Sequence, residues 1–369
     1  MPVIDHDTLR RYAIARTLFP PTTLLRAIRR LGFVQADPMR APARAQDLIL
    51  MHRVKDYRAG DLDARYPRLP VEEDCLVNYG FLPKEHLALL HPRTAKRVWD
   101  AATHARAAEV LAFVRQKGRT HPADVLAAFS HHGRVEGAWG GALNASTQLL
   151  DGMHYRGLLR VARRDTGTRV YEAIEHPPQD NSPAARHARA QALLDLVVQL
   201  YAPLPAASLG YLTTLLAYGA PHLRTEARAL CKAAPERYAH VKVDRERWFW
   251  PADESPAARR HQVDMEGVRF LAPFDPLVWD RRRFERLWGW AYRFEAYTPA
   301  ARRTRGHYAL PLLWGERMIG WANLKVVNRQ LVPDMGFIEK RPREAAFRRG
   351  LDEALHQTSV FLGLEDSRG

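Results

Sequence analysis

Two polar side chains near the start of the chain have types and a spacing that could support chemistry. Gln35 and Asp37 flank Ala36, and Pro38 follows them. Proline disfavours helix for the residue before it, so we expect an extended segment here. Side chains two residues apart on an extended segment project from the same face, roughly 6–7 Å apart at Cα. The amide and the carboxylate could therefore hold one water molecule between them. The same pattern is common where a loop ends, so a purely structural role remains an alternative.

Arginine clusters form the second group of candidate functional residues. Residues 281–305 carry a net charge of +6, and five arginines lie between residues 156 and 169. Arginine binds phosphate through two parallel hydrogen bonds, and phosphate contacts supply affinity without sequence choice. A solvated charged face is the alternative. The candidates for phosphate contacts are Arg40, Arg44, Arg156, Arg163, Arg164, Arg302, Arg303 and Arg305, although Arg40 or Arg44 could pair with Asp47 instead.

The composition of the whole chain favours a polyanionic partner. Its 369 residues include 56 Lys+Arg against 41 Asp+Glu, a formal charge of +15. Arginines outnumber lysines 48 to 8, which a GC-rich genome would also produce. A hydrophobic content of 46% is too high for a disordered chain. The first residues lack the apolar core of a signal peptide, and no apolar stretch could span a bilayer. We expect a cytoplasmic, nucleoid-associated bacterial monomer that contacts no membrane.

Other classes of site have little support in the sequence. Cys75 and Cys231 lie far apart, which excludes a four-thiolate metal site and a disulfide framework. His131 and His132 lack a spaced partner set such as H-E-x-x-H, so we expect no metal ion. The chain also has no phosphate-binding glycine loop and no G-x-S-x-G motif. We therefore expect no cofactor.

The elements that must position these residues follow from apolar spacing and from helix-stop signals. The spacing predicts one helix over 22–31, which Gly32 ends, and a second helix over 42–51. The extended Gln35 segment lies between them. Helices over 122–129 and 141–156 precede two strands that meet at a turn over 165–167. This order is typical of a winged helix. A looser copy, with helices over 184–201, 208–218 and 221–233 before two strands, extends to residue 250.

The fold class that these elements predict is α+β, with tandem winged-helix (helix-turn-helix) domains and a C-terminal β-rich module. We expect a winged-helix-like domain over 1–118 that carries Gln35 and Asp37, and winged-helix domains over 119–178 and 179–265. A mixed α/β, β-barrel-like module over 266–369 would include a helix over 281–295, strands after residue 307 and a closing helix over 342–362. The stretches 175–183 and 251–256 have the composition of linkers.

Several long segments of the chain resemble the winged-helix DNA glycosylases of the AlkZ/YcaQ-like family. The similar segments include LGFVQADPMRAPARAQDL at 31–48, EEDCLVNYGFLPKEHLALLHPR at 72–93, EGAWGGALNASTQLLDGMHYRGLLRVARR at 136–164, and the segment 271–321. The resemblance implies a tandem winged-helix scaffold on duplex DNA that removes N7-alkylated purines and unhooks interstrand crosslinks. Gln35 and Asp37 match the catalytic pair of the Gln-x-Asp branch. Ala36 departs from the pattern, because a bulkier aliphatic residue is expected between them.

The chemistry of such a lesion agrees with this pair of side chains. An N7-alkylated guanine is cationic, so its glycosidic bond breaks toward a positively charged sugar while a neutral base leaves. The reaction needs a negative charge and a placed water more than a general acid. Asp37 could supply the charge and accept the proton of the water that Gln35 orients. No lysine lies near the motif, so we predict a monofunctional glycosylase that leaves an abasic site.

Two other functions remain as alternatives at this stage. Winged helices are often found in transcriptional regulators, in which Gln35 and Asp37 would only brace the fold. A nuclease is disfavoured because the sequence has no acidic cluster spaced for Mg²⁺. A crosslinked base is tethered to both strands and cannot swing out freely, so the glycosylase interpretation requires an open site.

Overall fold

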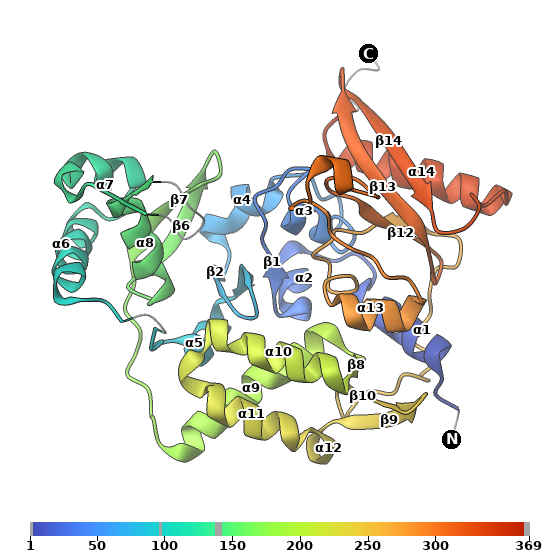
Figure 1. Cartoon of the computed structure of the whole chain (residues 1–369), viewed down its shortest axis with the longest axis horizontal. Coiled ribbons are helices and arrows are strands. Elements are labelled where there is room, and N and C mark those ends of the chain that lie inside the picture. The colour runs from blue at the N-terminus through green and yellow to red at the C-terminus, as the bar shows by residue number, and fades with distance from the viewer. Residues whose placement is uncertain (1–2, 96–97, 137–141, 365–369) are drawn as a thin grey trace. The chain divides into compact units, whose positions relative to one another are not determined.

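The computed structural model describes residues 3–95, 98–136 and 142–364 (Figure 1). It is a mixed α/β protein with several small sheets, as the α+β class requires. The chain divides into two compact units. Unit 1 comprises residues 1–62, 194–213 and 230–369, and unit 2 comprises residues 63–193 and 214–229. Among the described residues, every helix is too short or too polar to cross a bilayer.

Unit 1 begins with the elements that carry the Gln35 segment. Helices α1 (His6–Thr17) and α2 (Leu24–Leu31) precede β1 (Val34–Gln35), and α3 (Ala45–Leu50) follows it. The predicted helix over 22–31 is confirmed as α2, which buries Leu24, Ala27, Ile28 and Leu31. It ends where Gly32 takes a left-handed conformation with φ of 76°. The predicted extended segment is confirmed as a strand only for Val34 and Gln35, and Asp37 lies beyond the end of β1.

The C-terminal part of unit 1 contains an antiparallel sheet in the order β11-β12-β13-β14. Its strands are β11 (Val268–Phe270), β12 (Leu310–Trp314), β13 (Arg317–Val327) and β14 (Gln330–Phe337), and α14 (Ala345–Phe361) packs on β11 and β14. The strands predicted after residue 307 and the closing helix are confirmed. The helix predicted over 281–295 is wrong in its second half. Helix α13 (Arg281–Trp288) ends because Gly289 adopts a left-handed conformation.

A second small sheet of unit 1 has the order β8-β10-β9, formed by β8 (Leu204–Pro205), β9 (Ala239–Val243) and β10 (Glu246–Trp250). The helices predicted over 184–233 are confirmed, and each has residues in both units. They are α9 (Pro183–Tyr201), α10 (Ala206–Gly219) and α11 (Arg224–Lys232), and the short α12 (Ala234–Arg237) follows. Single 3₁₀ turns η4 (Pro221–Leu223) and η5 (Ala300–Arg302) complete the elements of residues 194–364.

Unit 2 contains the helix–helix–hairpin order that the sequence predicted. Its first part has the end of α4 (Asp61–Arg65), then η1 (Tyr66–Arg68), the hairpin β2 (Val71–Cys75) and β3 (Tyr79–Pro83), η2 (Lys84–His86) and α5 (Leu87–Leu90). Then follow α6 (Ala101–Lys117), α7 (Pro122–Ala128), η3 (Ser130–His132), the hairpin β4 (Arg134–Glu136) and β5 (Ala142–Asn144), α8 (Ala145–Tyr155), and the hairpin β6 (Leu159–Asp165) and β7 (Thr168–Ala173). The helix predicted over 141–156 begins at Ala145, after β5, and residue 141 lies outside the described residues.

A buried ion pair holds the end of α3 inside unit 1. The side chains of Arg53 and Asp275 have no exposed surface, and Arg53 Nη1 lies 2.8 Å from Asp275 Oδ2. Arg53 also donates to the backbone oxygens of Thr17 and Ile49. A buried charge that loses its partner is strongly destabilising, so this pair fixes α3 relative to the segment that leads into α13.

Candidate active site and DNA-binding surface

Gln35 is buried in β1, and one of its polar atoms forms no hydrogen bond there. Its exposed fraction is 5%, and its side-chain oxygen Oε1 is buried with no hydrogen-bond partner in the described part of the chain. Leaving a buried acceptor unsatisfied costs free energy, so such groups are rare and often functional. The amide oxygen is therefore available to accept a hydrogen bond from a bound water or substrate.

Asp37 is half-buried and is held by the backbone of Met39 and by Gln46 of α3. Its Oδ1 accepts a hydrogen bond from the Met39 backbone N–H at 2.9 Å. Its own backbone N–H donates to Oε1 of Gln46 at 3.2 Å. Among residues 3–95, 98–136 and 142–364, no cation forms an ion pair with its carboxylate. The charge of Asp37 is thus fixed in place but not neutralised.

The surroundings of Asp37 alter its protonation. Desolvation raises the pKa of Asp37 above its usual 3.8, and the hydrogen bond from Met39 only partly opposes this. Burial and then the Asp37 charge raise the pKa of Tyr308. Tyr308 is 2% exposed, and its hydroxyl finds no hydrogen-bond partner among the described residues. A neutral buried phenol therefore accompanies the carboxylate, a feature that the sequence did not signal.

A cavity of about 440 Å³ opens beside this segment in unit 1. Ala41, four residues after Asp37, lines it together with Tyr308 from the stretch before β12. Its charged lining consists of Arg303, Lys325 and Asp334. Gln35 and Asp37 do not line the cavity themselves, and Ala41 and Tyr308 are its links to their segment.

The stretch 291–308 is fixed in shape by a carboxylate. Glu295 accepts hydrogen bonds from the backbone N–H groups of Thr304 at 2.9 Å and Arg305 at 2.8 Å. Asn323 Nδ2 donates to the backbone oxygen of Arg305 at 2.7 Å. Gly306 has φ of 118°, a conformation that other residues adopt only with strain, and a Cβ there would lie 2.3 Å from Asn323 Oδ1. The wall of the cavity is therefore preorganised.

The candidate arginines of unit 1 divide into exposed and internally paired side chains. Arg40 and Arg302 are exposed. Arg303 is half-buried and donates to the Thr298 backbone oxygen at 2.7 Å. Arg44 is buried and pairs with Asp47 at 3.3 Å, the alternative that the sequence left open. Arg305 lies 3.5 Å from the Glu295 carboxylate, with its guanidinium near the rings of Trp290 and Trp321.

The candidate arginines of unit 2 all have partners within that unit. Arg156 lies over the Trp99 ring, 3.5 Å from its centre. Arg163 pairs with Asp165 across 2.8 Å, and Arg164 Nε donates to Glu73 Oε1 at 2.8 Å. These two arginines project from β6, and Glu73 belongs to β2. Arg163 keeps an exposed side chain, whereas Arg164 is largely covered.

Comparison with known proteins identifies the family. The model of the family described as "DNA glycosylase AlkZ-like" matches residues 28–361, nearly the whole chain. The chain belongs to the AlkZ-like family of DNA glycosylases. Its fold is similar to that of the Streptomyces sahachiroi DNA glycosylase AlkZ, with a TM-score of 0.60 and 13% identity over 98% of each chain. The AlkZ-like protein is thus a DNA-repair glycosylase, and the alternative of a regulator without catalysis is set aside.

The matched region of this AlkZ-like glycosylase also contains a buried network that the sequence did not reveal. In unit 2, Asp74 accepts hydrogen bonds from His91 at 2.6 Å and from Arg93 at 2.9 Å. Burial alone would raise the pKa of Asp74, but Arg93 and His91 lower it well below its usual range. Arg93 also donates to the Cys75 backbone oxygen. The network braces the β2–β3 hairpin, and we assign it a structural role.

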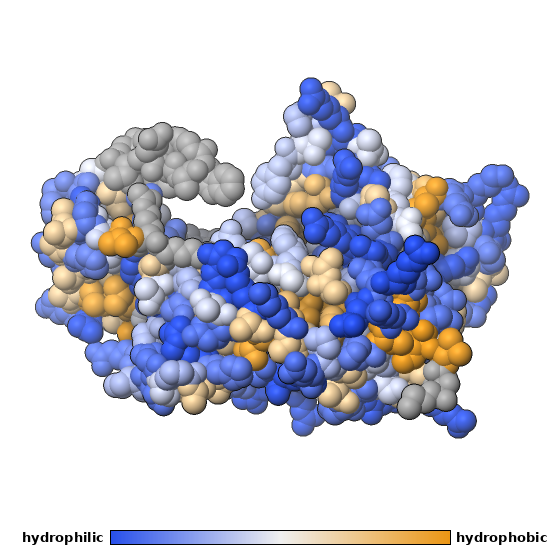
Figure 2. Space-filling model, turned by 60° about the horizontal axis from the view of Figure 1, so that its bottom comes forward, coloured by the Kyte–Doolittle hydropathy of each residue, from blue (hydrophilic) through white to orange (hydrophobic). Residues whose placement is uncertain are grey.

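The surface of the AlkZ-like glycosylase suits a charged ligand. In the space-filling view, hydrophilic side chains cover most of the visible face, and apolar ones form small separate groups (Figure 2). The whole chain has a formal charge of +15. A surface rich in arginine attracts the phosphates of DNA, the substrate of the family.

Proposed function

We propose that this AlkZ-like glycosylase hydrolyses the N-glycosidic bond of N7-alkylated purines in duplex DNA and leaves an abasic site. By the same reaction on one of the two joined bases, it would unhook an interstrand crosslink. The observation that carries this proposal is the half-buried carboxylate of Asp37, held without an ion pair in the described residues and two positions from the unsatisfied amide oxygen of Gln35.

The proposed reaction uses this pair directly. The bond between the sugar C1′ and the base nitrogen breaks, and its electron pair neutralises the cationic purine. The Asp37 carboxylate stabilises the positive charge that develops on the sugar, and partial desolvation strengthens this attraction. The Gln35 oxygen accepts a hydrogen bond from the attacking water. As the water oxygen bonds to C1′, Asp37 takes up its proton.

We expect exposed arginines of both units to bind the phosphates of the duplex. Arg40 follows the Gln35–Asp37 segment and Arg302 belongs to η5, so both are suited to contact phosphates near the lesion. Arg303 lines the cavity, and Arg163 on the β6–β7 hairpin keeps an exposed side chain. Arg44, Arg164 and Arg305 are ion-paired and, unlike the ion-paired Arg163, largely covered, so they would act mainly by positioning. We retain Arg156 as a candidate and propose that the scaffold is a monomer built from tandem winged helices.

The test compares wild type with Asp37→Asn on a duplex crosslinked by a nitrogen mustard. Wild type should separate the strands and leave an abasic site that alkali converts to a break. Asp37→Asn should lose this product while its affinity for DNA is kept or raised, because the neutral side chain no longer repels phosphate. Equal unhooking by both proteins would overturn the proposal.

A parallel reaction in EDTA distinguishes a glycosylase from a nuclease. The proposed step takes its charge and its proton acceptor from Asp37, so base release should persist in the chelator. Strand breaks that form without alkali and that disappear in EDTA would contradict the proposal, because they are the products of metal-assisted phosphodiester cleavage.

A further inference from the structure

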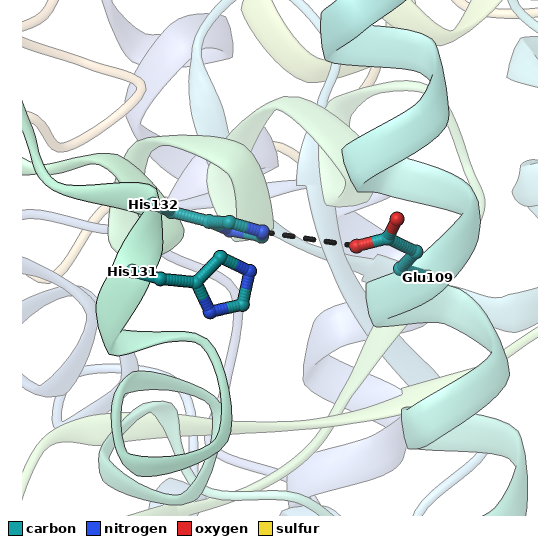
Figure 3. A group of neighbouring side chains, drawn as sticks. All are labelled: Glu109, His131 and His132. Atoms are coloured by element: carbon teal, nitrogen blue, oxygen red, sulfur yellow. Dashed lines mark ion pairs between the residues drawn. The ribbon is translucent and has the colours of Figure 1, made fainter.

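Three potential metal ligands from separate parts of unit 2 meet at one place (Figure 3). Glu109 projects from α6, whereas His131 and His132 belong to η3. One ligand atom from each residue lies within 4.8 Å of the other two. The Nε2 atom of His132 is 3.9 Å from Glu109 Oε2. The sequence suggested no metal site because the third ligand is remote along the chain and only the fold brings it to the two histidines.

The ring nitrogens of His132 form no hydrogen bond in the described structure. Its side chain is 4% exposed, and both Nδ1 and Nε2 are buried without a hydrogen-bond partner. The ring stacks on Phe129 at 5.1 Å and meets the edge of His131 at 4.6 Å. These contacts hold the ring with a nitrogen directed toward Glu109, as Figure 3 shows. An imidazole with two buried, unsatisfied nitrogens needs an explanation, and a bound ion beside Glu109 and His131 provides one.

We propose that Glu109, His131 and His132 bind a divalent transition-metal ion of the zinc class. Two imidazole nitrogens and one carboxylate oxygen are a ligand set that Zn²⁺ accepts, with a water molecule in the fourth position. Bonds of about 2.0–2.1 Å require the ligand atoms to approach more closely than they do here. Glu109 and His131 are exposed and can make that approach by a change of rotamer.

Such an ion would join α6 to the segment between α7 and β4 within unit 2. Binding to the folded form alone stabilises that form by mass action, so the melting temperature should rise with metal concentration. The ion has no part in the proposed base-release step. The metal-site proposal and the proposed role of Asp37 can therefore be tested separately.

The experiment titrates the full-length, tag-free, chelator-treated protein with Zn²⁺ in a calorimeter and with Co²⁺ in a spectrophotometer. Wild type should bind one ion more tightly than the rest, with the strong visible absorption of a four-coordinate Co²⁺ site. Glu109→Ala and His131→Ala should each weaken that binding by about tenfold or more, in the range known for disturbed metal sites. His187→Ala removes an exposed histidine from α9 and serves as the matched control, with wild-type affinity.

Both test residues are exposed, so their replacement by alanine should leave unit 2 folded, which circular dichroism would verify. Zn²⁺ should raise the melting temperature of wild type and His187→Ala but not that of Glu109→Ala. Equal Zn²⁺ affinity in wild type, Glu109→Ala and His131→Ala would overturn the proposal. Absence of a Zn²⁺ site in wild type would overturn it as well.

Discussion

At the scale of single residues, the protein holds a carboxylate where solvation is poor and no cation compensates it in the described structure. Desolvation raises the pKa of Asp37, and the one backbone hydrogen bond from Met39 does not cancel that effect. A neutral side chain at this position would make the folded protein more stable. We therefore attribute the retained charge to catalysis, in which a poorly solvated carboxylate attracts a sugar cation more strongly.

The poor solvation of the ionised Asp37 leads to a stability prediction for Asp37→Asn. A folded-state pKa above the unfolded value means that the folded protein binds the proton more tightly, so ionisation lowers stability as pH rises through that pKa. Asn carries no charge and can still accept the Met39 hydrogen bond. Its melting temperature should exceed that of wild type at pH 7, and the difference should shrink toward pH 4. Asp352→Asn, at an exposed site on α14, is the control and should show little change.

Gln35 provides the second prediction at this scale. Removal of its amide by Gln35→Ala should slow base release about 10²-fold or more, because the attacking water loses the group that orients it. DNA affinity should be nearly unchanged, since Gln35 is buried. Single-turnover rates on an N7-methylguanine duplex measure the first effect and fluorescence anisotropy the second. A wild-type rate would remove Gln35 from the reaction.

At the scale of elements, several helices and the β6–β7 hairpin could be predicted from the sequence, whereas the β2–β3 and β4–β5 hairpins and the contacts between distant segments could not. Apolar spacing and Gly32 predicted α2, and the turn at 165–167 predicted the β6–β7 hairpin. The stop of α13 was missed because Gly289 lies within an Arg-rich, helix-compatible stretch. The Gln35–Asp37 pair was a candidate from its spacing and matched the family's catalytic pattern through the resemblance, and its role stays a prediction. Tyr308, Glu295 and the Arg53–Asp275 pair had no sequence signal, because they depend on partners remote along the chain.

The Arg53–Asp275 pair allows a prediction about how α3 is held. Asp275→Ala leaves the guanidinium of Arg53 buried without its counterion, which should lower the free energy of unfolding by about 3–5 kcal/mol. The double variant Arg53→Met with Asp275→Leu should recover part of the loss, because it removes both charges. Urea denaturation of the three proteins measures these differences. A loss below about 1 kcal/mol for Asp275→Ala would show that the pair does not hold α3.

At the scale of the whole molecule, the positive charge predicted a nucleic-acid substrate, but it could not show which arginines are available. The composition does not distinguish Arg44 from Arg302. The structure pairs the first with Asp47 and leaves the second exposed. Division of the chain into units also depended on long-range contacts, since unit 1 is assembled from three separate stretches. Local patterns along the sequence contain no information about that assembly.

The exposed arginines permit a test of the binding surface. Each phosphate contact contributes about 0.9 to the slope of log affinity against log salt concentration. Arg302→Ala should reduce this slope by about 0.9 on undamaged duplexes of any sequence. Arg44→Ala is the matched control and should leave the slope unchanged, whatever it does to stability. An identical slope for wild type and Arg302→Ala would exclude Arg302 from the interface.

The central claim is that the ionised carboxylate of Asp37 drives base release, and the pH dependence of one rate tests it most directly. We would measure single-turnover release of N7-methylguanine from a duplex by wild type and Asp37→Asn, corrected for spontaneous loss. The wild-type rate should fall on the acidic side with an apparent pKa above 3.8, since desolvation raises the pKa of Asp37. Asp37→Asn should be slower by about 10²-fold or more and should lack that acidic limb. An Asp37→Asn rate close to wild type, with the same acidic limb, would contradict the account.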